Sequence, residues 1–418
     1  MNVRADRFPL FDSLRAVAAL SVVAFHACYF AGDGIFGATT FRQLAARLDV
    51  GVTIFFLISG FLLYRPFVRA RLRGEPGPRV AAYAWRRALR IAPAYWVALT
   101  VVALWLGLSE VFTASGIPRF YGFAQIYDAG TALQGIGQAW TLCVEVSFYA
   151  FLPLWALVMR RLPATAPRRA LMFEVGGLAA LFLFSTVYKV WALKQVAPTD
   201  LDAAPYLMPL PNFLDQFALG MGLAVLSVWY DERERLPRPL AVLQRRPEIA
   251  WLVALVAFWA AATRIGYTGE PLQIYSRTTF LWRHELYSVV ALGAILPALL
   301  ATPGRGVAGR FLGSRVMAYL GLVSYAIYLY HFAVVDQLHS WLGDDLPESI
   351  AGRLVFYLPV TALGAAVIAS LSYYAVERPA LSLKRLVPLR SPAARGEAVE
   401  EPAPAEPEPA PAASGPPR

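Results

Sequence analysis

Three ionisable side chains stand in the first long apolar run of the chain, LFDSLRAVAALSVVAFHACYF at residues 10–30. Arg15 and His26 are eleven residues apart, so on a helix they lie about 20° from each other around the axis, on one face. Asp12 stands one turn before Arg15 and can pair with it. An arginine at the centre of a spanning helix costs about 2.5–3.5 kcal/mol, so this face is a candidate functional surface with a cation and a proton carrier.

Two more arginines, Arg87 and Arg90, form an i, i+3 pair in the segment YAWRRALRIAP. The pair is expected at the cytoplasmic end of its helix, at about the depth of Arg15. Two interpretations stay open. The arginines, with Arg86, could anchor the helix at lipid headgroups, or Arg87 and Arg90 could clamp an anion, because guanidinium groups match the geometry of phosphate oxygens.

Glu145 is the only acid in the run AWTLCVEVSFYAFLPLW, which enters the membrane from the outer side. We expect it roughly 9 Å deep, close to the depth of His26, which lies roughly 24 Å along the first helix from its cytoplasmic end. A carboxylate beside an imidazole selects its tautomer and raises its basicity, so Glu145 is predicted to orient His26. Alternatively, Glu145 hydrogen-bonds with Tyr149, one turn on, for packing only.

The remaining ionisable residues of the apolar runs carry weaker signals. His331, in LVSYAIYLYHFAVV, is expected near the depth of His26. It could contact the acceptor substrate, act as a second proton carrier, or be a neutral interior histidine that is only hydrogen-bonded. His284 and His339 are assigned to outer loops or helix ends without a functional signal. Asp215 and Glu377 are acids near helix ends, and Glu377 is expected to pair with cytoplasmic arginines. Neither predicts catalysis.

The composition identifies the kind of protein in which these residues stand. Of 418 residues, 58% are hydrophobic and 16% charged, and the mean hydropathy is +0.50, which is typical of a polytopic membrane protein. The two cysteines, Cys28 and Cys143, stand inside apolar runs and are expected to be packing residues. They can form neither a disulfide framework nor zinc-ligand spacing, so no metal is expected.

The chain is therefore predicted to be all-α, with about ten apolar runs near the length that spans roughly 30 Å of hydrocarbon. The ten runs lie at 10–30, 49–67, 88–108, 139–158, 173–193, 211–230, 248–264, 286–302, 317–338 and 354–377.

The connections between the runs alternate in charge. Arginines gather before the first run and in the second, fourth, sixth and eighth connections, whereas the others hold far fewer basic residues. This positive-inside pattern predicts that both termini are cytoplasmic and explains the net charge of +10 without a nucleic-acid partner. Residues 1–390 are expected to form the membrane domain. The Pro/Ala/Glu-rich segment 391–418 is expected to be a disordered cytoplasmic tail.

Several segments together resemble the acyltransferase family 3 of integral membrane proteins. The resemblance runs from Phe8 to about Pro379 and keeps the order of the family's motifs. Two positions depart from the common form: Ser13 replaces a common glycine, and YHFAV replaces the more frequent His-Trp-Pro motif. The segments that carry it are FDSLRAVAALSVVAFH with Arg15 and His26, FFLISGFLL, the Arg-x-x-Arg pair Arg87 and Arg90, WTLCVEVSFYAFLPL, SYAIYLYHF and VERP.

The resemblance implies an O-acyltransferase in the cytoplasmic membrane. Acyl-CoA, commonly acetyl-CoA, would dock from the cytoplasm with its phosphates near Arg15, Arg87 and Arg90. His26, oriented by Glu145, would act as general base on a hydroxyl of a sugar, envelope glycan, glycolipid or glycosylated natural product. The predicted substrate-binding residues are His331, Tyr149 and Trp140.

A proton-coupled transporter is the competing expectation, because an intramembrane pair such as His26 and Glu145 beside a basic vestibule would serve one equally well. Against it, the sequence has no convincing inverted repeat and no matched pair of Gly- or Pro-broken helices. A scaffold without catalysis leaves Arg15, His26 and Glu145 unexplained. The acyltransferase interpretation accounts for more of the costly residues.

Overall fold

The computed structural model describes residues 8–32, 39–163, 166–198, 200–231, 236–265, 276–301, 304, 306–342, 347 and 349–387. Within these ranges the chain forms helices joined by short connections, and no β-strand. The predicted tail at 391–418 lies outside the described residues.

Each of the ten predicted apolar runs overlaps a long helix. In chain order the helices are α1 (Pro9–Ala31), α3 (Gly51–Arg73), α4 (Val80–Leu106), α6 (Trp140–Arg161), α7 (Pro167–Gln195), α9 (Leu214–Tyr230), α11 (Glu248–Thr263), α12 (Arg277–Leu300), α15 (Ser324–Leu342) and α16 (Ile350–Ser372). Short helices connect them: α2 (Thr40–Ala45), α5 (Gly116–Tyr121), α8 (Ala204–Leu207), α10 (Arg238–Arg245), α13 (Gly306–Leu312), α14 (Arg315–Leu322) and α17 (Arg378–Ser382).

The lengths and composition of these helices identify a polytopic membrane protein. In the described residues, 7 helices are long and apolar enough to cross a membrane, or up to 9 if each of two bent pairs is one span. The bent pairs are α10 with α11, at 94°, and α14 with α15, at 73°. The 17-residue helix α9 is apolar but shorter.

The eighth predicted run begins too late in the sequence. Helix α12 starts at Arg277 rather than near residue 286, and the Ser276 side chain caps it by accepting a hydrogen bond from the Thr279 backbone N–H at 3.0 Å. The polar residues of its first turns, including Arg283 and His284, hide this start from a hydropathy criterion.

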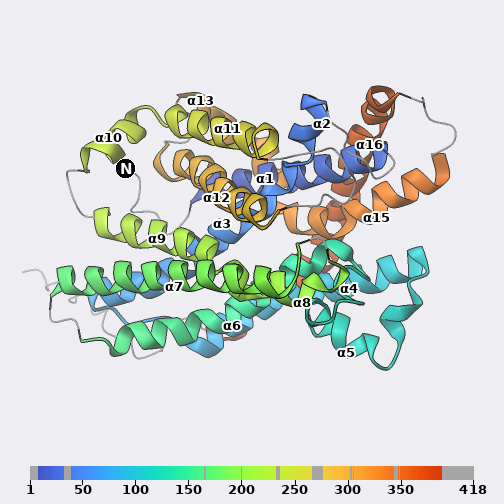
Figure 1. Cartoon of the computed structure of the whole chain (residues 1–418). Helices are drawn as coiled ribbons and strands as arrows, with labels where there is room; N and C mark the ends of the chain where they lie inside the picture. The colour runs from blue at the N-terminus through green and yellow to red at the C-terminus, as the bar shows by residue number, and fades with distance from the viewer. Residues whose placement is uncertain are drawn as a thin grey trace, which may run out of the picture.

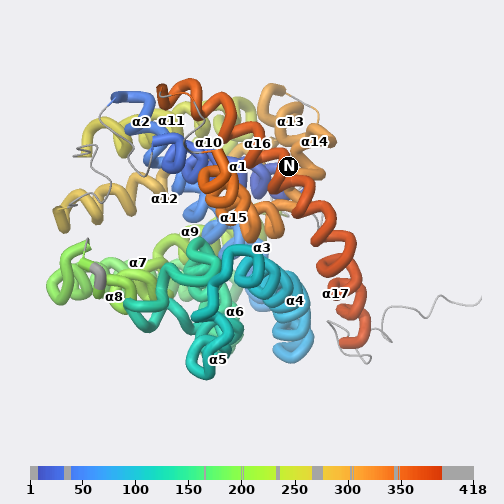
Figure 2. The backbone as a smooth tube through the Cα atoms, turned by 90° about the vertical axis from the view of Figure 1, so that its right-hand side faces the viewer, coloured from blue at the N-terminus to red at the C-terminus, as the bar shows by residue number. Residues whose placement is uncertain are grey.

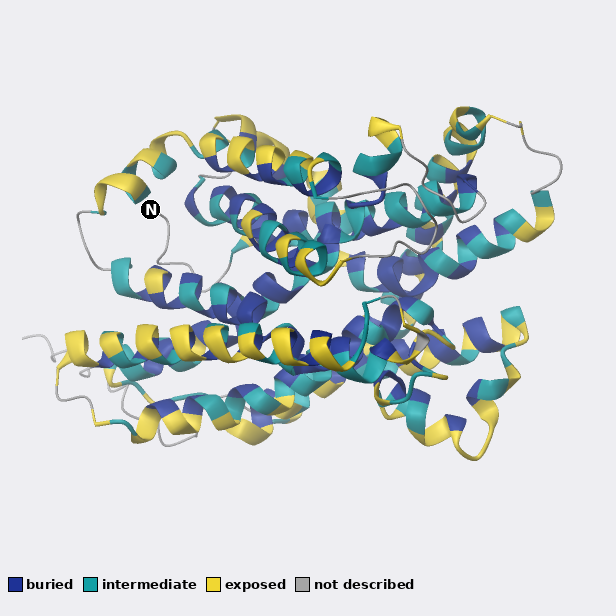
Figure 3. Ribbon diagram, viewed as in Figure 1, coloured by how far each residue is buried: buried dark blue, intermediate teal, exposed yellow. Residues whose placement is uncertain are grey.

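The helices form two layers with a central pair between them. Figures 1 and 2 show α4, α6 and α7 in the lower layer and α1, α11 and α12 in the upper layer, with α3 and α9 between. Figure 3 shows that α9 is largely buried, whereas exposed residues follow one face of α7. The core of the molecule therefore lies where the layers meet.

Small residues allow the central pair to pack closely. A Cβ atom on Gly60 of α3 would collide with the Phe217 carbonyl oxygen, and one on Gly220 of α9 would collide with the Leu57 carbonyl oxygen. Close approach of backbones at glycine is the usual way in which membrane helices gain packing contacts, because lipid supplies no hydrophobic force between them.

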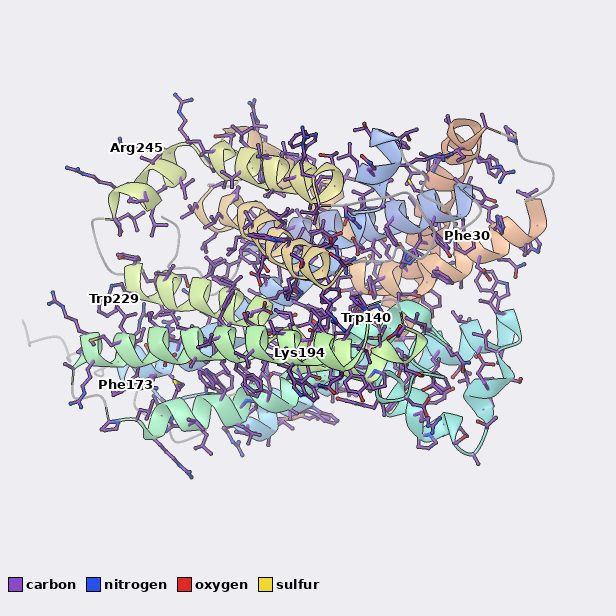
Figure 4. The ribbon with its side chains drawn as sticks, in the orientation of Figure 1. Phe30, Trp140, Phe173, Lys194, Trp229 and Arg245 are labelled. Atoms are coloured by element: carbon purple, nitrogen blue, oxygen red, sulfur yellow. The ribbon has the colours of Figure 1, made fainter. Side chains whose placement is uncertain are left out.

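The ends of the bundle agree with the alternation of charge. Figure 4 places Phe173, Trp229 and Arg245, which flank the fourth and sixth connections, at the left end, and Phe30 toward the right. The arginine-rich fourth and sixth connections therefore lie at one end of the molecule. This is the arrangement that the positive-inside pattern requires of a cytoplasmic face.

Candidate active site

A cavity of about 230 Å³ lies where the two layers meet. Its wall is built by five helices, α1, α3, α4, α6 and α15, that are far apart in the sequence. Three of its charged side chains are basic and one is acidic. The polar residues of the wall are Arg15, Ser59, Arg87, Arg90, Thr141, Glu145, Tyr149, Ser324, Tyr325 and Tyr328. We call this space the arginine cavity.

Two of the three arginines of the arginine cavity are paired with acids outside its wall. Arg15 Nη1 lies 2.7 Å from Asp12 Oδ1, as the sequence predicted. Arg90 Nη1 lies 3.3 Å from Glu377 Oε2, and this confirms the expected pairing of Glu377 with an arginine. Both guanidinium groups are thus partly neutralised and held in place.

Arg87 differs from its two neighbours. Among the described residues it has no acidic partner, and its buried Nε has no hydrogen-bond partner. Its guanidinium lies 5.9 Å from the centre of the Tyr149 ring, within range of a cation–π contact. A buried donor without a partner is costly, so this side chain is prepared to receive an anion.

Glu145 projects from α6 into the arginine cavity. The Ser59 hydroxyl of α3 donates a short hydrogen bond to its Oε1. Among the described residues, no hydrogen bond joins Glu145 to His26, the residue it was expected to orient. The two residues lie at similar depths along their helices, but depth does not determine where the helices stand around the bundle.

His26 pairs instead with His331. The Nδ1 atom of His26 lies 3.0 Å from Nε2 of His331 and 3.0 Å from the carbonyl oxygen of Val22, one turn back on α1. Helix α1 packs directly against α15, and this packing brings together two histidines that are 305 positions apart in the sequence.

The hydrogen bonds of the pair select one tautomer for each histidine. Nδ1 of His331 lies 2.9 Å from the Tyr328 carbonyl oxygen and 3.1 Å from that of Ile327, and a carbonyl can only accept. His331 therefore carries its proton on Nδ1 and accepts at Nε2 when neutral. His26 must then donate from Nδ1, which leaves its Nε2 with a free lone pair, as a general base requires.

Tyr328 connects the arginine cavity to the histidine pair. It lines the cavity, its ring centre lies 5.8 Å from that of His331, and its hydroxyl lies 2.8 Å from the Thr141 hydroxyl. Its hydroxyl also donates to the Gln138 carbonyl oxygen at 3.0 Å. Tyr328 was not predicted as a site residue from the sequence, although a tyrosine one turn before His331 in an apolar helix was a usable signal.

The structure therefore brings together most of the residues that the sequence singled out. Arg15, Arg87, Arg90, Glu145 and Tyr149 share one cavity, and His26 lies against His331. The exception among them is Trp140, which is absent from the wall of the cavity and packs its ring 5.6 Å from that of Phe213.

A second polar cluster was missed by the sequence analysis. Asp215 of α9 forms an ion pair with Lys189 of α7, and its Oδ2 lies 2.9 Å from Nε2 of His284 on α12. The expectation that His284 lies in a loop or at a helix end is wrong, because the longer α12 contains it and leaves it 6% exposed. A lysine inside the apolar α7 run was the available signal.

Neither polar region has the composition of a metal centre. In the part of the chain that the structure describes, no group of three or more His, Cys, Asp and Glu side chains could hold a metal ion. The chemistry that the geometry offers is proton transfer at His26 and anion binding at the arginine cavity.

The family model Acyl_transf_3, described as an acyltransferase domain, matches residues 9–373. "Acyltransferase MdmB" of Streptomyces mycarofaciens is 25% identical over 417 residues, which are 92% of this chain and 94% of that protein. "Peptidoglycan O-acetyltransferase OatA" of Listeria monocytogenes is 24% identical over 387 residues, 89% of this chain and 55% of that protein.

YrhL of Bacillus subtilis (strain 168) is 23% identical over 388 residues, 89% of this chain and 54% of that protein. The chain thus spans about half the length of YrhL and OatA, and nearly all of MdmB. No solved structure matches this chain.

Proposed function

This chain belongs to the acyltransferase 3 family, and from that membership we propose that it moves an acetyl group from acetyl-CoA to a hydroxyl group of a saccharide acceptor. The acceptor class that we propose comprises sugars, envelope glycans, glycolipids and glycosylated natural products. The name of OatA, a peptidoglycan O-acetyltransferase, supports an envelope glycan within this class.

One observation supports the proposal. The histidine pair, with a free basic nitrogen on His26, contacts Tyr328, and Tyr328 lines the cavity that holds Arg87 without an acidic partner among the described residues. Acyl transfer from CoA needs both parts, an anion site for the phosphates of the donor and a base for the attacking hydroxyl. Tyr328 borders the cavity on one side and lies near His331 on the other.

At the donor end, we assign the phosphate contacts first to Arg87. Its Nε lacks a partner, whereas Arg15 and Arg90 already face Asp12 and Glu377. Arg15 and Arg90 would add positive potential and hold the wall in place. Glu145, bound to Ser59 among these arginines, would act as a positioning residue for the donor rather than for His26.

At the reacting atoms, Nε2 of His26 accepts the proton of the acceptor hydroxyl while its oxygen attacks the thioester carbonyl carbon. The carbon–sulfur bond breaks, and the CoA thiolate takes the proton back from the imidazolium, so that an ester and free CoA leave. His331 acts as a positioning residue, because its Nε2 accepts from His26 Nδ1 and stabilises the imidazolium that forms.

We further propose that the protein lies in the cytoplasmic membrane with both termini in the cytoplasm, so that acetyl-CoA enters at the end where α1 and α4 begin. The positions of Arg15, Arg87 and Arg90 in the first halves of these helices support this direction. Membership in an acyltransferase family gives the transporter interpretation no comparable support.

The test uses the full chain in nanodiscs, incubated with acetyl-CoA and a panel of sugar, glycan and glycolipid acceptors while thiol release is followed. We expect acceptor-dependent release that disappears in His26→Ala. The matched control is His339→Ala, which removes a histidine of α15 that hydrogen-bonds to Tyr357 and lies outside the histidine pair. Wild-type protein that releases no thiol with acetyl-CoA or longer acyl donors, and binds no CoA, would refute the proposal.

A further inference from the structure

A second cavity, of about 310 Å³, is lined by the stretch of α15 that follows the stretch lining the arginine cavity. Its wall comes from the C-terminal end of α4, the segment before α6 and the middle of α15. The residues that concern us are Glu110, Gln134, Gln138, Phe332 and Asp336. We call it the carboxylate–amide cavity.

The two cavities follow each other along the same helices. On α15, Ser324, Tyr325 and Tyr328 line the arginine cavity, and the next turns, from Leu329 to Asp336, line the carboxylate–amide cavity. On α4 the lining changes from Ile91 to Val102, a rise of about 16 Å along the helix axis. The second cavity is therefore nearer the predicted outer end.

The histidine pair contacts one residue from the wall of each cavity, although neither histidine is itself part of the two walls. The ring centre of His26 lies 5.2 Å from that of Phe332 in the wall of the carboxylate–amide cavity. On the other side, the His331 ring lies 5.8 Å from that of Tyr328 in the wall of the arginine cavity. A base between two cavities is suited to join two substrates.

Gln138 separates the cavities and keeps an unused acceptor. Its side-chain Nε2 donates to the backbone oxygens of Tyr328 at 3.0 Å and Leu329 at 3.1 Å. It is 6% exposed, and its Oε1 has no hydrogen-bond partner. A buried amide oxygen without a donor is costly, so the position favours a ligand that supplies a hydroxyl.

The other polar groups of this wall also favour a ligand that supplies hydroxyl groups. The carboxylates of Glu110 and Asp336 accept hydrogen bonds, Gln134 both donates and accepts, and Phe332 offers an apolar ring. In contrast to the arginine cavity, this wall holds no basic side chain. Carboxylates and amides beside an aromatic ring match the hydroxyl groups and the C–H face of a sugar, and they repel phosphate.

We infer that the carboxylate–amide cavity is the acceptor site, in which a polyhydroxylated sugar binds through Gln138, Asp336 and Glu110 with one hydroxyl directed at Nε2 of His26. The inference rests on the proposed function, since it names the acceptor's place in that reaction. Donor and acceptor thus approach the histidine pair from opposite sides of the membrane, and the two sites have opposite charge.

The kinetic test separates the two substrates. Asp336→Asn and Glu110→Gln keep the side-chain shape and remove a charged acceptor, so each should raise the KM for the acceptor about tenfold or more, with the KM for acetyl-CoA unchanged. Asp202→Asn is the matched control, because it removes an exposed carboxylate of the same predicted face outside this wall. An unchanged KM for the acceptor in both variants would overturn the inference.

A binding test does not depend on turnover. Gln134→Cys places a thiol at an exposed position of the wall, in a background with Cys28→Ser and Cys143→Ala. A membrane-impermeant maleimide should label it from the outer face of sealed vesicles, and tri-N-acetylchitotriose, maltotriose or the acceptor that supports thiol release should slow the labelling. Labelling that no saccharide slows, in protein with acceptor-dependent turnover, would overturn the acceptor site.

The two tests also separate this inference from the proposed function. Absence of thiol release with every acyl-CoA, combined with protection of Gln134→Cys by a saccharide, would refute acyl transfer and support a carbohydrate site. Normal acyl transfer with an unchanged acceptor KM in the variants would leave the proposed function standing and refute this acceptor site.

Discussion

Two of the regions in which the bundle buries charged side chains differ in how completely those side chains are paired. At the Lys189–Asp215–His284 cluster, each charge faces a partner: the carboxylate of Asp215 receives the lysine ammonium, Nε2 of His284 and the Ser185 hydroxyl at 3.1 Å. At the arginine cavity, Arg87 keeps a buried Nε without a partner beside open space.

The difference shows that a buried charge alone does not identify an active site in a membrane protein. Charges that are paired with one another, as in the Asp215 cluster, join helices, here α7, α9 and α12. A cavity with an unsatisfied cation, next to a base with a free nitrogen, retains that capacity. We therefore expect substitutions in the two regions to have opposite effects on turnover and on stability.

The largest expected effect is on turnover in His26→Ala. Loss of a general base typically costs about 10²- to 10⁴-fold in kcat, whereas removal of a partly exposed side chain beside Phe332 should leave the thermal unfolding of the protein in nanodiscs near that of the wild type. Initial rates of acceptor-dependent thiol release and unfolding temperatures measure both. If His26→Ala retained activity close to that of the wild type, the histidine pair would not be catalytic and would not differ from the Asp215 cluster in function.

The reverse is expected for Asp215→Ala. Removing the shared carboxylate leaves Lys189 and His284 buried without their partner, which costs about 3–5 kcal/mol of stability. The unfolding temperature of the purified protein should fall steeply, and the double variant Lys189→Met, Asp215→Leu should recover part of the loss because no lone charge remains. A stable Asp215→Ala protein without turnover would instead assign the cluster to catalysis.

A smaller effect is expected at the donor end. Arg87→Ala should raise the KM for acetyl-CoA about 10- to 100-fold, as loss of a charge-assisted phosphate contact would, with little change in kcat. Arg86→Ala is the matched control, because the neighbouring arginine does not line the arginine cavity. If Arg87→Ala and Arg86→Ala changed the KM for acetyl-CoA equally, Arg87 would be a headgroup anchor rather than a phosphate contact.

The smallest expected effect concerns the partner of His26. His331→Leu removes one of the two acceptors of His26 Nδ1 and leaves the Val22 carbonyl oxygen. It should lower kcat about tenfold, since the imidazolium that forms on His26 loses a stabilising hydrogen bond. His331→Gln restores an acceptor oxygen and should recover most of the rate, with the KM for acetyl-CoA unchanged in both. Two equally slow variants would mean that His331 acts on packing rather than on His26.

Much of the fold followed from periodicity and composition. Ten apolar runs of near-membrane length predicted the long helices, because the bilayer requires each span to satisfy its backbone within the helix. The eighth run failed at its start, since Arg283 and His284 lie inside α12 although hydropathy places such residues in a loop. The bend between α14 and α15 also has no counterpart in the apolar pattern.

The sequence by itself determined which side chains are costly in lipid, and thereby the candidates Arg15, His26, Arg87, Arg90 and Glu145. The helical repeat predicted the pairing of Arg15 with Asp12, and the tertiary structure decided the other partners. The position along a helix follows from the rise per residue, but lateral neighbours depend on how the helices pack. Glu145 lies beside the arginines because five distant helices converge on one cavity, and His26 lies beside His331 because α1 packs against α15. Arg87 lines that cavity with a buried Nε that has no partner in the described part of the chain.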